Sequence, residues 1–225
     1  MPTATIKVHH LNNSRSQRVL WMLEELELPY ELVKYDRMAN GLAPPTLQAV
    51  HPLGKSPVIQ DGEVVVAESG AILEYLVDAA GGKLGVAAGT AAQRDYRYWM
   101  HYAEGSLMPL LLMKLVFARV KSAPMPFFVK PVAKRIANTV EGQFVAPNLE
   151  RHVAFIADWL AKRTWFVGDG AALTAADVQM SFPMEALAAR VPGVPAVIAN
   201  WVTAMKARPA FQRALDKGGS YDIMS

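Results

Sequence analysis

Hydroxyl and carboxyl side chains stand at three turns in the first third of the chain. Ser14 separates a β-branched apolar segment from a run with helical spacing. Ser56-Pro57 precedes a second apolar segment, and Glu68-Ser69 begins an amphipathic one. Open α/β sheets bind ligands beside strand ends and helix starts, because unpaired N–H groups and the helix dipole attract anions there. We therefore expect the three turns to converge on one ligand site.

Each of these residues also has a purely structural interpretation. Ser14 and Gln17 have the spacing of a capping box, and Ser69 could serve only as an N-cap. Glu68 could be an acid of a first helical turn, and Pro57 could mark the edge of a strand. It is their occurrence together, in this order, that favours a binding site.

Other chemical motifs fail on inspection. Gly54-Lys55-Ser56 resembles the end of a phosphate-binding loop, but Ala49 stands where that motif needs its first glycine, and Pro57 follows. The sequence has no Gly-x-Ser-x-Gly elbow. Its five histidines show no ligand spacing, so we expect no metal site.

Strand and helix patterns alternate over the first 80 residues and supply the elements that position these turns. The expected strands are 5–11, 31–36, 57–60 and 63–67, and the expected helices start near residue 14 and span 69–79. A loop with at most one short helix is expected over 40–48. Asp61-Gly62 predicts a hairpin with a type I′ turn. The order is βαβ, a short helix, then ββα, which implies a right-handed parallel crossover in the first half.

Strand patterns disappear beyond a glycine-rich stretch. Helices are expected over 91–120, 129–141, 148–162, 174–190 and 194–206. Pro109 predicts a break in the first of them, and Thr174 with Asp177 predicts a capped start of the fourth. We therefore expect an α/β domain over 1–81, a linker over 82–90 and an all-α domain over 91–225.

The composition excludes several classes of protein. The 225 residues include no cysteine, which rules out disulfides, thiolate metal sites and a cysteine nucleophile, so any thiol chemistry must use a thiol from outside. A net charge of +3, with no basic run interleaved with aromatics, argues against nucleic-acid binding. There is no signal-peptide pattern and no apolar run long enough for a membrane span. We expect a cytoplasmic protein with no nucleic-acid or membrane partner.

The sequence resembles the cytosolic glutathione transferase family over almost its whole length. The segments that carry the resemblance are 13–18 (NSRSQR), 51–58 (HPLGKSPV), 67–72 (AESGAI) and 173–177 (LTAAD). Two more, 104–109 (EGSLMP) and 181–183 (SFP), resemble a fungal and bacterial branch. The resemblance implies a thioredoxin-like N-terminal domain (βαβαββα) followed by an all-helical domain. It also implies a homodimeric transferase that uses glutathione as co-substrate.

The resemblance implies roles for residues of the predicted site. Pro57 would be a cis-proline that turns the backbone of Ser56 toward the cysteinyl part of glutathione, which would pair like an added strand. Glu68 would bind the ammonium group of the γ-glutamyl end, and Ser69 its α-carboxylate. Lys55 would contact the carboxylate at the glycine end.

Ser14 is the expected catalytic residue. A free thiol has a pKa of about 8.5. A charge-assisted hydrogen bond worth about 1.5–3 kcal/mol would lower that pKa by about 1–2 units and make the thiolate common at neutral pH. Asn13 is the alternative donor of this hydrogen bond.

The electrophile, a small hydrophobic compound or a peroxide, is expected to bind between the domains along the helix that starts at residue 91. Tyr98, Tyr102 and Met108 are the candidate pocket residues, with His101 and Glu104 at the rim or facing a partner subunit. Glutathione-dependent peroxide or disulfide reduction needs the same site and is an alternative. A non-catalytic interaction module on the same fold is another.

Overall fold

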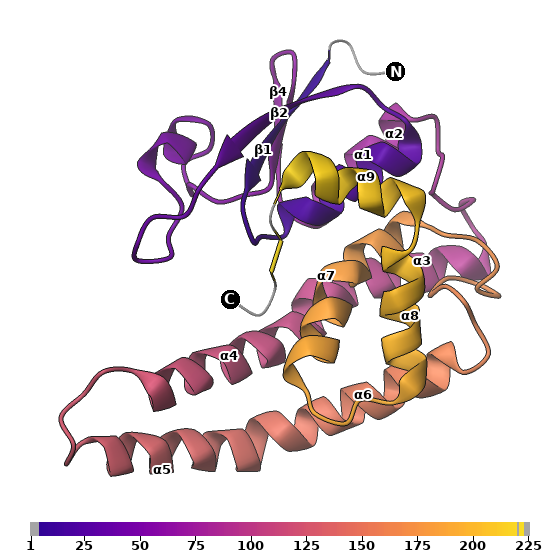
Figure 1. The fold of residues 1–225 in the computed structure, drawn as a ribbon. Helices are drawn as coiled ribbons and strands as arrows, with labels where there is room; N and C mark the ends of the chain where they lie inside the picture. Colours follow the sequence, from indigo (N-terminus) through magenta and orange to yellow (C-terminus); the bar gives the residue numbers. More distant parts are fainter. Residues whose placement is uncertain (1–4, 220, 223–225) are drawn as a thin grey trace.

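A mixed sheet forms the N-terminal part of the computed structural model, which describes residues 5–219 and 221–222. Its strands are β1 (Ile6–Leu11), β2 (Tyr30–Tyr35), β3 (Val58–Asp61) and β4 (Val64–Ala67). They stand in the order β2-β1-β3-β4, with β1 parallel to β2 and the other pairs antiparallel. Helices α1 (Ser16–Leu26) and α2 (Ser69–Ala79) pack against each other and against the second domain (Figure 1).

The predicted hairpin is confirmed, but its turn lies one residue later than expected. Asp61 pairs with Val64, so Gly62 and Glu63 occupy the central positions. Gly62 has a φ of 59°, and Glu63 does not share this positive φ. Glycine at the first central position alone is the pattern of a type II′ turn rather than type I′. The predicted short helix is a single 3₁₀ turn, η1 (Pro45–Ala49).

Helices make up the rest of the described chain, as the sequence predicts. They are α3 (Ala91–Tyr102), α4 (Met108–Ser122), α5 (Lys130–Val140), α6 (Ala146–Leu160), α7 (Ala175–Arg190), α8 (Ala196–Lys206) and α9 (Pro209–Gly218). Helices α4 and α5 form a long hairpin that extends away from the sheet (Figure 1). Asp177 caps α7 as predicted, accepting hydrogen bonds from the Thr174 backbone and hydroxyl and from the Phe166 N–H.

Two π-helical turns stand where the sequence suggested helix ends. The first, η2 (Ala103–Leu107), joins α3 to α4, and Pro109 follows it in the first turn of α4. The predicted break is present, but it lies before Pro109 rather than at it. A proline in the first turn of a helix is tolerated because the N–H it lacks would have no intrahelical partner there. The second, η3 (Glu141–Val145), joins α5 and α6 into one path, although two separate helices were expected.

Helix α9 is absent from the sequence prediction. It packs against α1, so the chain returns to the first domain at its end (Figure 1). Phe211 meets Trp21 edge to face at 5.5 Å, and Arg213 and Lys217 both form ion pairs with Glu24. Its apolar face is short, with Phe211 and Leu215 one turn apart among alanines, and the helices predicted from the sequence end at residue 206.

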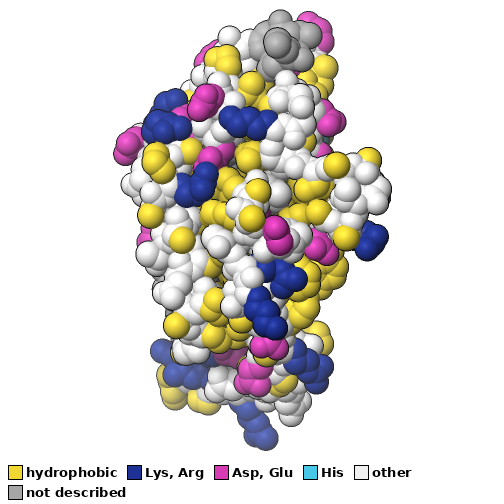
Figure 2. All heavy atoms as spheres, turned by 90° about the vertical axis from the view of Figure 1, so that its right-hand side faces the viewer, with side chains coloured by type: hydrophobic (Ala, Val, Ile, Leu, Met, Phe, Trp, Pro, Cys, Tyr) yellow, Lys and Arg dark blue, Asp and Glu magenta, His cyan; other side chains and the backbone are white. Residues whose placement is uncertain are grey.

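No helix in the described part of the chain is long and apolar enough to cross a membrane. Figure 2 shows the face on the right of Figure 1, where cationic and anionic side chains are interspersed.

Candidate functional site

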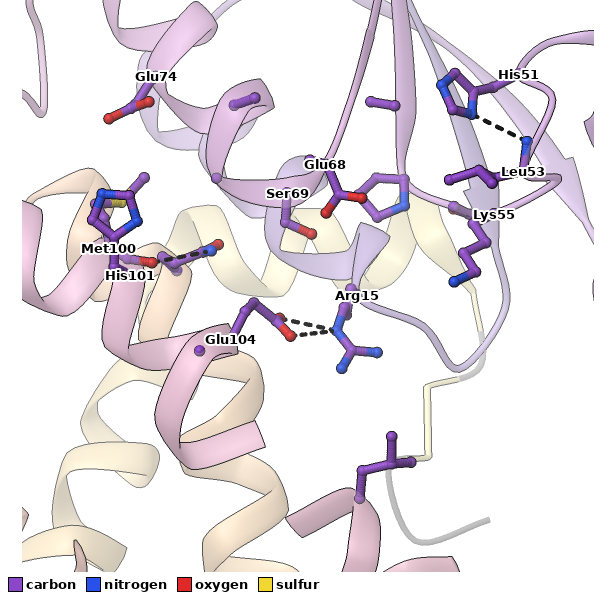
Figure 3. A pocket seen from close by; sticks show the side chains of 18 residues that line it. Arg15, His51, Leu53, Lys55, Glu68, Ser69, Glu74, Met100, His101 and Glu104 are labelled. Carbon is purple, nitrogen blue, oxygen red and sulfur yellow. Dashed lines mark hydrogen bonds and ion pairs between the residues drawn. The ribbon is translucent and has the colours of Figure 1, made fainter. Parts of the chain in front are cut away.

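A cavity of about 830 Å³ lies between the two domains. One wall comes from the segment before β3 and the start of α2, and the other from α3, η2, α4 and α7 (Figure 3). Its volume is in the range of sites that enclose small molecules, roughly 300–1,000 Å³. Five of the residues predicted from the sequence line it together: Lys55, Ser56, Pro57, Glu68 and Ser69.

Ser56 offers its backbone to the cavity. The Ser56–Pro57 bond is cis, as the resemblance implies. The Ser56 hydroxyl donates to the carbonyl of His9 at 2.8 Å and accepts from the N–H of Leu11 at 3.1 Å, which ties the side chain to β1. Within the described part of the chain, the backbone N–H and C=O of Ser56 have no backbone partner. Both groups are therefore available to an extended ligand.

The start of α2 brings opposite charges to the same wall. Glu68 has a φ of 72° and a ψ of 125°, a strained conformation of the kind that concentrates at binding sites. It turns the chain so that Ser69, which is buried, opens the helix at the cavity. The first-turn N–H groups and the dipole attract an anion there, while the exposed carboxylate of Glu68 attracts a cation. Together they fit the ammonium and carboxylate of an α-amino acid.

The opposite wall holds an ion-paired cluster that the sequence did not reveal. The Nε atom of Arg15 donates to the two carboxylate oxygens of Glu104 at 2.9 and 3.1 Å (Figure 3). Arg18, which is fully buried, pairs with the same carboxylate. Its Nη1 also donates to the backbone oxygen of Gln179 at 2.6 Å and to its Oε1 at 2.9 Å. Arg15 and Gln179 line the cavity, and no local pattern distinguishes either of them.

The charges of this cluster depend on one another. Burial alone would raise the pKa of Glu104, but the adjacent Arg18 and Arg15 guanidiniums outweigh it and hold that pKa below its usual value. Burial lowers the pKa of Arg18, and Glu104 offsets part of this effect. Because Arg18 belongs to α1 while Glu104 and Gln179 belong to η2 and α7, the cluster connects the two domains at the floor of the cavity.

Ser14 is not among the residues that line the cavity. It is 6% exposed, and its Oγ lies 2.7 Å from the Oγ of Ser16, which lies 2.8 Å from Nδ1 of His10. Burial lowers the pKa of His10 to about 4, and its ring also hydrogen bonds to the Gly218 backbone. The neutral ring therefore donates to Gly218, and the one hydroxyl proton of Ser16 is directed to Nδ1 of His10 or to the carbonyl of Leu11 at 3.2 Å. Ser14 Oγ accepts from the Ser16 N–H at 3.2 Å and can donate its own proton to the Ser16 hydroxyl. The role of Ser14 stays a prediction.

Asn13 lies beside the C-terminal segment rather than the cavity. Its Oδ1 accepts from the N–H of Asp222 at 2.7 Å, and its carbonyl accepts from Arg37 at 3.0 Å. Asn13 itself adopts a φ of 49°. The loop before α1 is therefore held by contacts on its outer side.

The three predicted pocket residues also lie outside this cavity. Tyr98 and Tyr102 line a neighbouring surface depression of about 570 Å³, and their rings stack at 5.5 Å. Met108 is buried in the core. Met100 and Leu112 line the cavity instead. Met100 lies two residues from both Tyr98 and Tyr102 on α3, which at about 100° per residue places it on a different side of the helix from the two tyrosines. His101 and Glu104 stand on the cavity wall, as the rim expectation anticipated (Figure 3).

Comparison with known proteins agrees with this arrangement. A family model described as the glutathione S-transferase N-terminal domain matches residues 4–78. Glutathione S-transferase 3 of Schizosaccharomyces pombe is 36% identical over 94% of this chain and 87% of its own length. The chain belongs to the glutathione S-transferase family. Glutathione S-transferase 1 of Saccharomyces cerevisiae is 33% identical to this transferase and covers 96% of it, with 97% of the relative matched.

Solved structures share the fold of this transferase. A glutathione S-transferase from Actinobacillus pleuropneumoniae is 31% identical, with a TM-score of 0.77 over 97% of this chain and 95% of its own. Ure2p in complex with glutathione is 21% identical, with a TM-score of 0.71 over 96% of this chain and all of its own, and shows a common fold. These comparisons confirm the predicted family and its two-part architecture.

Removing the carboxylate of Glu104 should destabilise the transferase. Glu104→Gln leaves the buried Arg18 without its anionic partner, and breaking a buried ion pair costs about 3 kcal/mol or more, equivalent to a fall in Tm of about 6–12 °C at this chain length. Thermal unfolding measures the change. Glu74→Gln is the matched control, since Glu74 lines the same cavity without a salt bridge among the described residues. Equal shifts in the two variants would contradict this role.

Acid should destabilise the transferase through His10. The folded state holds the pKa of His10 near 4, whereas an unfolded histidine has a pKa of about 6.5. Between these values only the unfolded chain takes up the proton, so stability falls as the pH falls, by roughly 2 kcal/mol from pH 7 to 5. Urea unfolding at both pH values measures this loss.

His10→Gln should remove that loss, whereas His101→Gln, at an exposed ring, should retain it. Burial raises the pKa of Asp177 to about 6, which acts in the opposite direction below that pH. The contribution of His10 is therefore obtained by comparing how much the free energy of unfolding changes between pH 7 and pH 5 in the variant and in the parent, rather than by comparing their stabilities at one pH. The same slope in all three proteins would show that His10 does not carry the effect.

Proposed function

We propose that this transferase binds glutathione in the interdomain cavity and stabilises its thiolate for attack on a small hydrophobic electrophile. The observation that carries the proposal is the convergence of two separate segments, 55–57 and 68–69, on one wall of a single cavity. The chemistry of that wall matches the peptide group by group. It offers a helix start and a carboxylate at one end, a free backbone in the middle and a lysine beyond.

Glutathione would lie along this wall in an extended conformation. The γ-glutamyl end places its carboxylate at the backbone N–H and the hydroxyl of Ser69 and its ammonium at Glu68. The cysteinyl part pairs with the free backbone of Ser56, as a peptide adds to a sheet edge. Lys55, which is exposed at the cavity, lies where it can bind the carboxylate of the glycine end.

The sulfur of a ligand in this pose points toward the loop before α1 and the start of that helix. Two groups there favour a thiolate. The Ser14 hydroxyl can turn its proton from Ser16 toward the sulfur, and Arg15 brings a positive charge to the cavity wall. Glu104 bonds only the Nε atom of Arg15, and the two terminal nitrogens of the guanidinium point away from that carboxylate (Figure 3). The family uses such polarisation to lower the pKa of the thiol, and we assign it here to Ser14, with Asn13 as the alternative.

Calorimetric titration tests the binding site. The parent protein should bind glutathione saturably, and Ser69→Ala should weaken binding about tenfold to a hundredfold, because the hydrogen bond from its hydroxyl to a charged carboxylate is worth about 1.5–3 kcal/mol. Ser122→Ala, at the far end of α4, is the matched control and should bind as the parent does. A parent protein that binds no glutathione would overturn the proposed function at its root.

Kinetics with a chlorodinitrobenzene electrophile test the catalytic assignment. Ser14→Ala should raise the pKa of the bound thiol by about 1–2 units, lower kcat about tenfold or more, and leave glutathione affinity within a few fold. The absorbance of the thiolate as a function of pH gives that pKa directly. If Asn13→Ala produces these changes and Ser14→Ala does not, the role belongs to Asn13.

A further inference from the structure

The loop between α4 and α5 carries two highly exposed aromatic side chains. Phe127 is 87% exposed and Phe128 is 67% exposed, and their rings meet edge to face at 5.6 Å. The loop that carries them joins α4 to α5 at the tip of the hairpin, far from the sheet (Figure 1). Single exposed apolar residues are common on proteins, but adjacent phenylalanines at a protruding tip indicate a surface that meets another molecule.

The apolar surface continues from the tip along α5. Val129, Val132 and Ile136 are 39%, 58% and 57% exposed, and their spacing of three and four residues places them on one side of the helix. We call Phe127, Phe128, Val129, Val132 and Ile136 the tip patch. None of these five side chains belongs to the buried core, and none lines the interdomain cavity.

The hairpin is also strongly cationic. Residues 105–140 include no aspartate or glutamate, although they hold six of the 23 lysines and arginines in the chain. The remaining residues therefore carry three more acids than bases, since all 20 acids lie outside the hairpin. Figure 2 shows the mixed signs on the face at the opposite end of the molecule. The positive charge of the protein is concentrated around its exposed apolar tip.

Most of these cations are available to a partner. Lys114 and Lys121 of α4 both pair with Glu141, which follows α5, at 2.9 and 2.5 Å. The other four are exposed, and none of them forms a salt bridge with the described residues: Arg119, Lys130, Lys134 and Arg135. On α5, Lys130 and Lys134 stand one turn apart and directly flank the apolar stripe.

An anionic lipid surface combines the two properties that this hairpin requires. Phenylalanine side chains enter the boundary between head groups and acyl chains, while flanking lysines and arginines bind anionic head groups. A nucleic acid would meet the charge, but aliphatic side chains such as Val132 and Ile136 do not stack on bases. A second copy docked tip to tip would bring two cationic hairpins together. The lipid surface is therefore the occupant that the charges favour.

We propose that the α4–α5 hairpin docks this transferase on anionic membranes, with Phe127 and Phe128 inserted and the cations of α5 against the head groups. The expectation of no membrane partner rested on the lack of a spanning segment, and interfacial binding requires none. The proposal is independent of glutathione binding, because no residue of the tip patch lines the interdomain cavity.

Vesicle sedimentation with the full-length protein tests this proposal. The protein should sediment with vesicles of phosphatidylcholine mixed with phosphatidylserine, much less with phosphatidylcholine alone, and should be released by high salt. Phe127→Ser with Phe128→Ser should lower the bound fraction about tenfold. Val64→Thr with Val65→Thr, an adjacent exposed pair on β4, should bind as the parent does.

A second pair of variants separates local from overall charge. Lys130→Gln with Lys134→Gln should weaken binding, whereas Lys83→Gln with Lys162→Gln removes the same charge elsewhere and should not. Circular dichroism and glutathione titration show whether each variant is folded. The proposal is overturned if the parent ignores anionic vesicles, or if the phenylalanine variant binds them equally well. It is also overturned if that variant only shifts a dimer toward monomer in analytical ultracentrifugation while the parent shows no lipid binding.

Discussion

The ion pair between Arg18 and Glu104 is the constraint on which the arrangement of this transferase depends. A fully buried guanidinium requires an anionic partner, and the only carboxylate that Arg18 meets in a salt bridge among the described residues comes from the other domain. Glu104 lies in the π turn η2, and α7 of the same domain adds two hydrogen bonds to Arg18 through the backbone oxygen and Oε1 of Gln179. The start of α1, the wide turn and α7 are therefore held in one register. Since Arg15 at the start of α1, Glu104 of η2 and Gln179 of α7 all line the cavity, the position of its second-domain wall depends on this ion pair.

Elements defined by short-range patterns could be predicted from the sequence. The β3–β4 hairpin depends on one glycine between apolar segments, and α7 depends on the reciprocal Thr174 and Asp177 hydrogen bonds. Elements defined by distant contacts could not. Helix α9 has a short apolar face, and it is held by Glu24 and Glu25, which lie more than 180 residues earlier in the chain. Both π turns contain a Glu-Gly pair, Glu104-Gly105 and Glu141-Gly142, but such a pair alone does not predict a π turn.

The candidate site divides in the same way. The wall from the first domain was predictable, because a strand end and a helix start orient Ser56 and Ser69 through local geometry. The opposite wall depends on which side of each helix faces the first domain: Met100 lines the cavity while Tyr98 and Tyr102 of the same helix do not, and Leu112 lines it one turn beyond the buried Met108. The burial of Ser14 could not be predicted either, because it follows from a hydrogen-bond chain that ends at His10, and nothing in the sequence places that ring beside it.

The two π turns also limit where the sequence of this protein can gain or lose residues without changing the direction of the hairpin. Each adds a residue to a helical path, and each lies at the base of the hairpin, where Glu141 of η3 bonds two lysines of α4. A deletion within η2 would restore a regular helix and rotate everything beyond it by about 100°. Leu112 would leave the cavity, and the whole hairpin would face another direction. We therefore expect insertions and deletions in the loop at 123–129, where they change only the length of the hairpin. In η2 or η3 they would rotate the helices that follow. Divergent relatives should vary the reach of the hairpin more readily than its orientation.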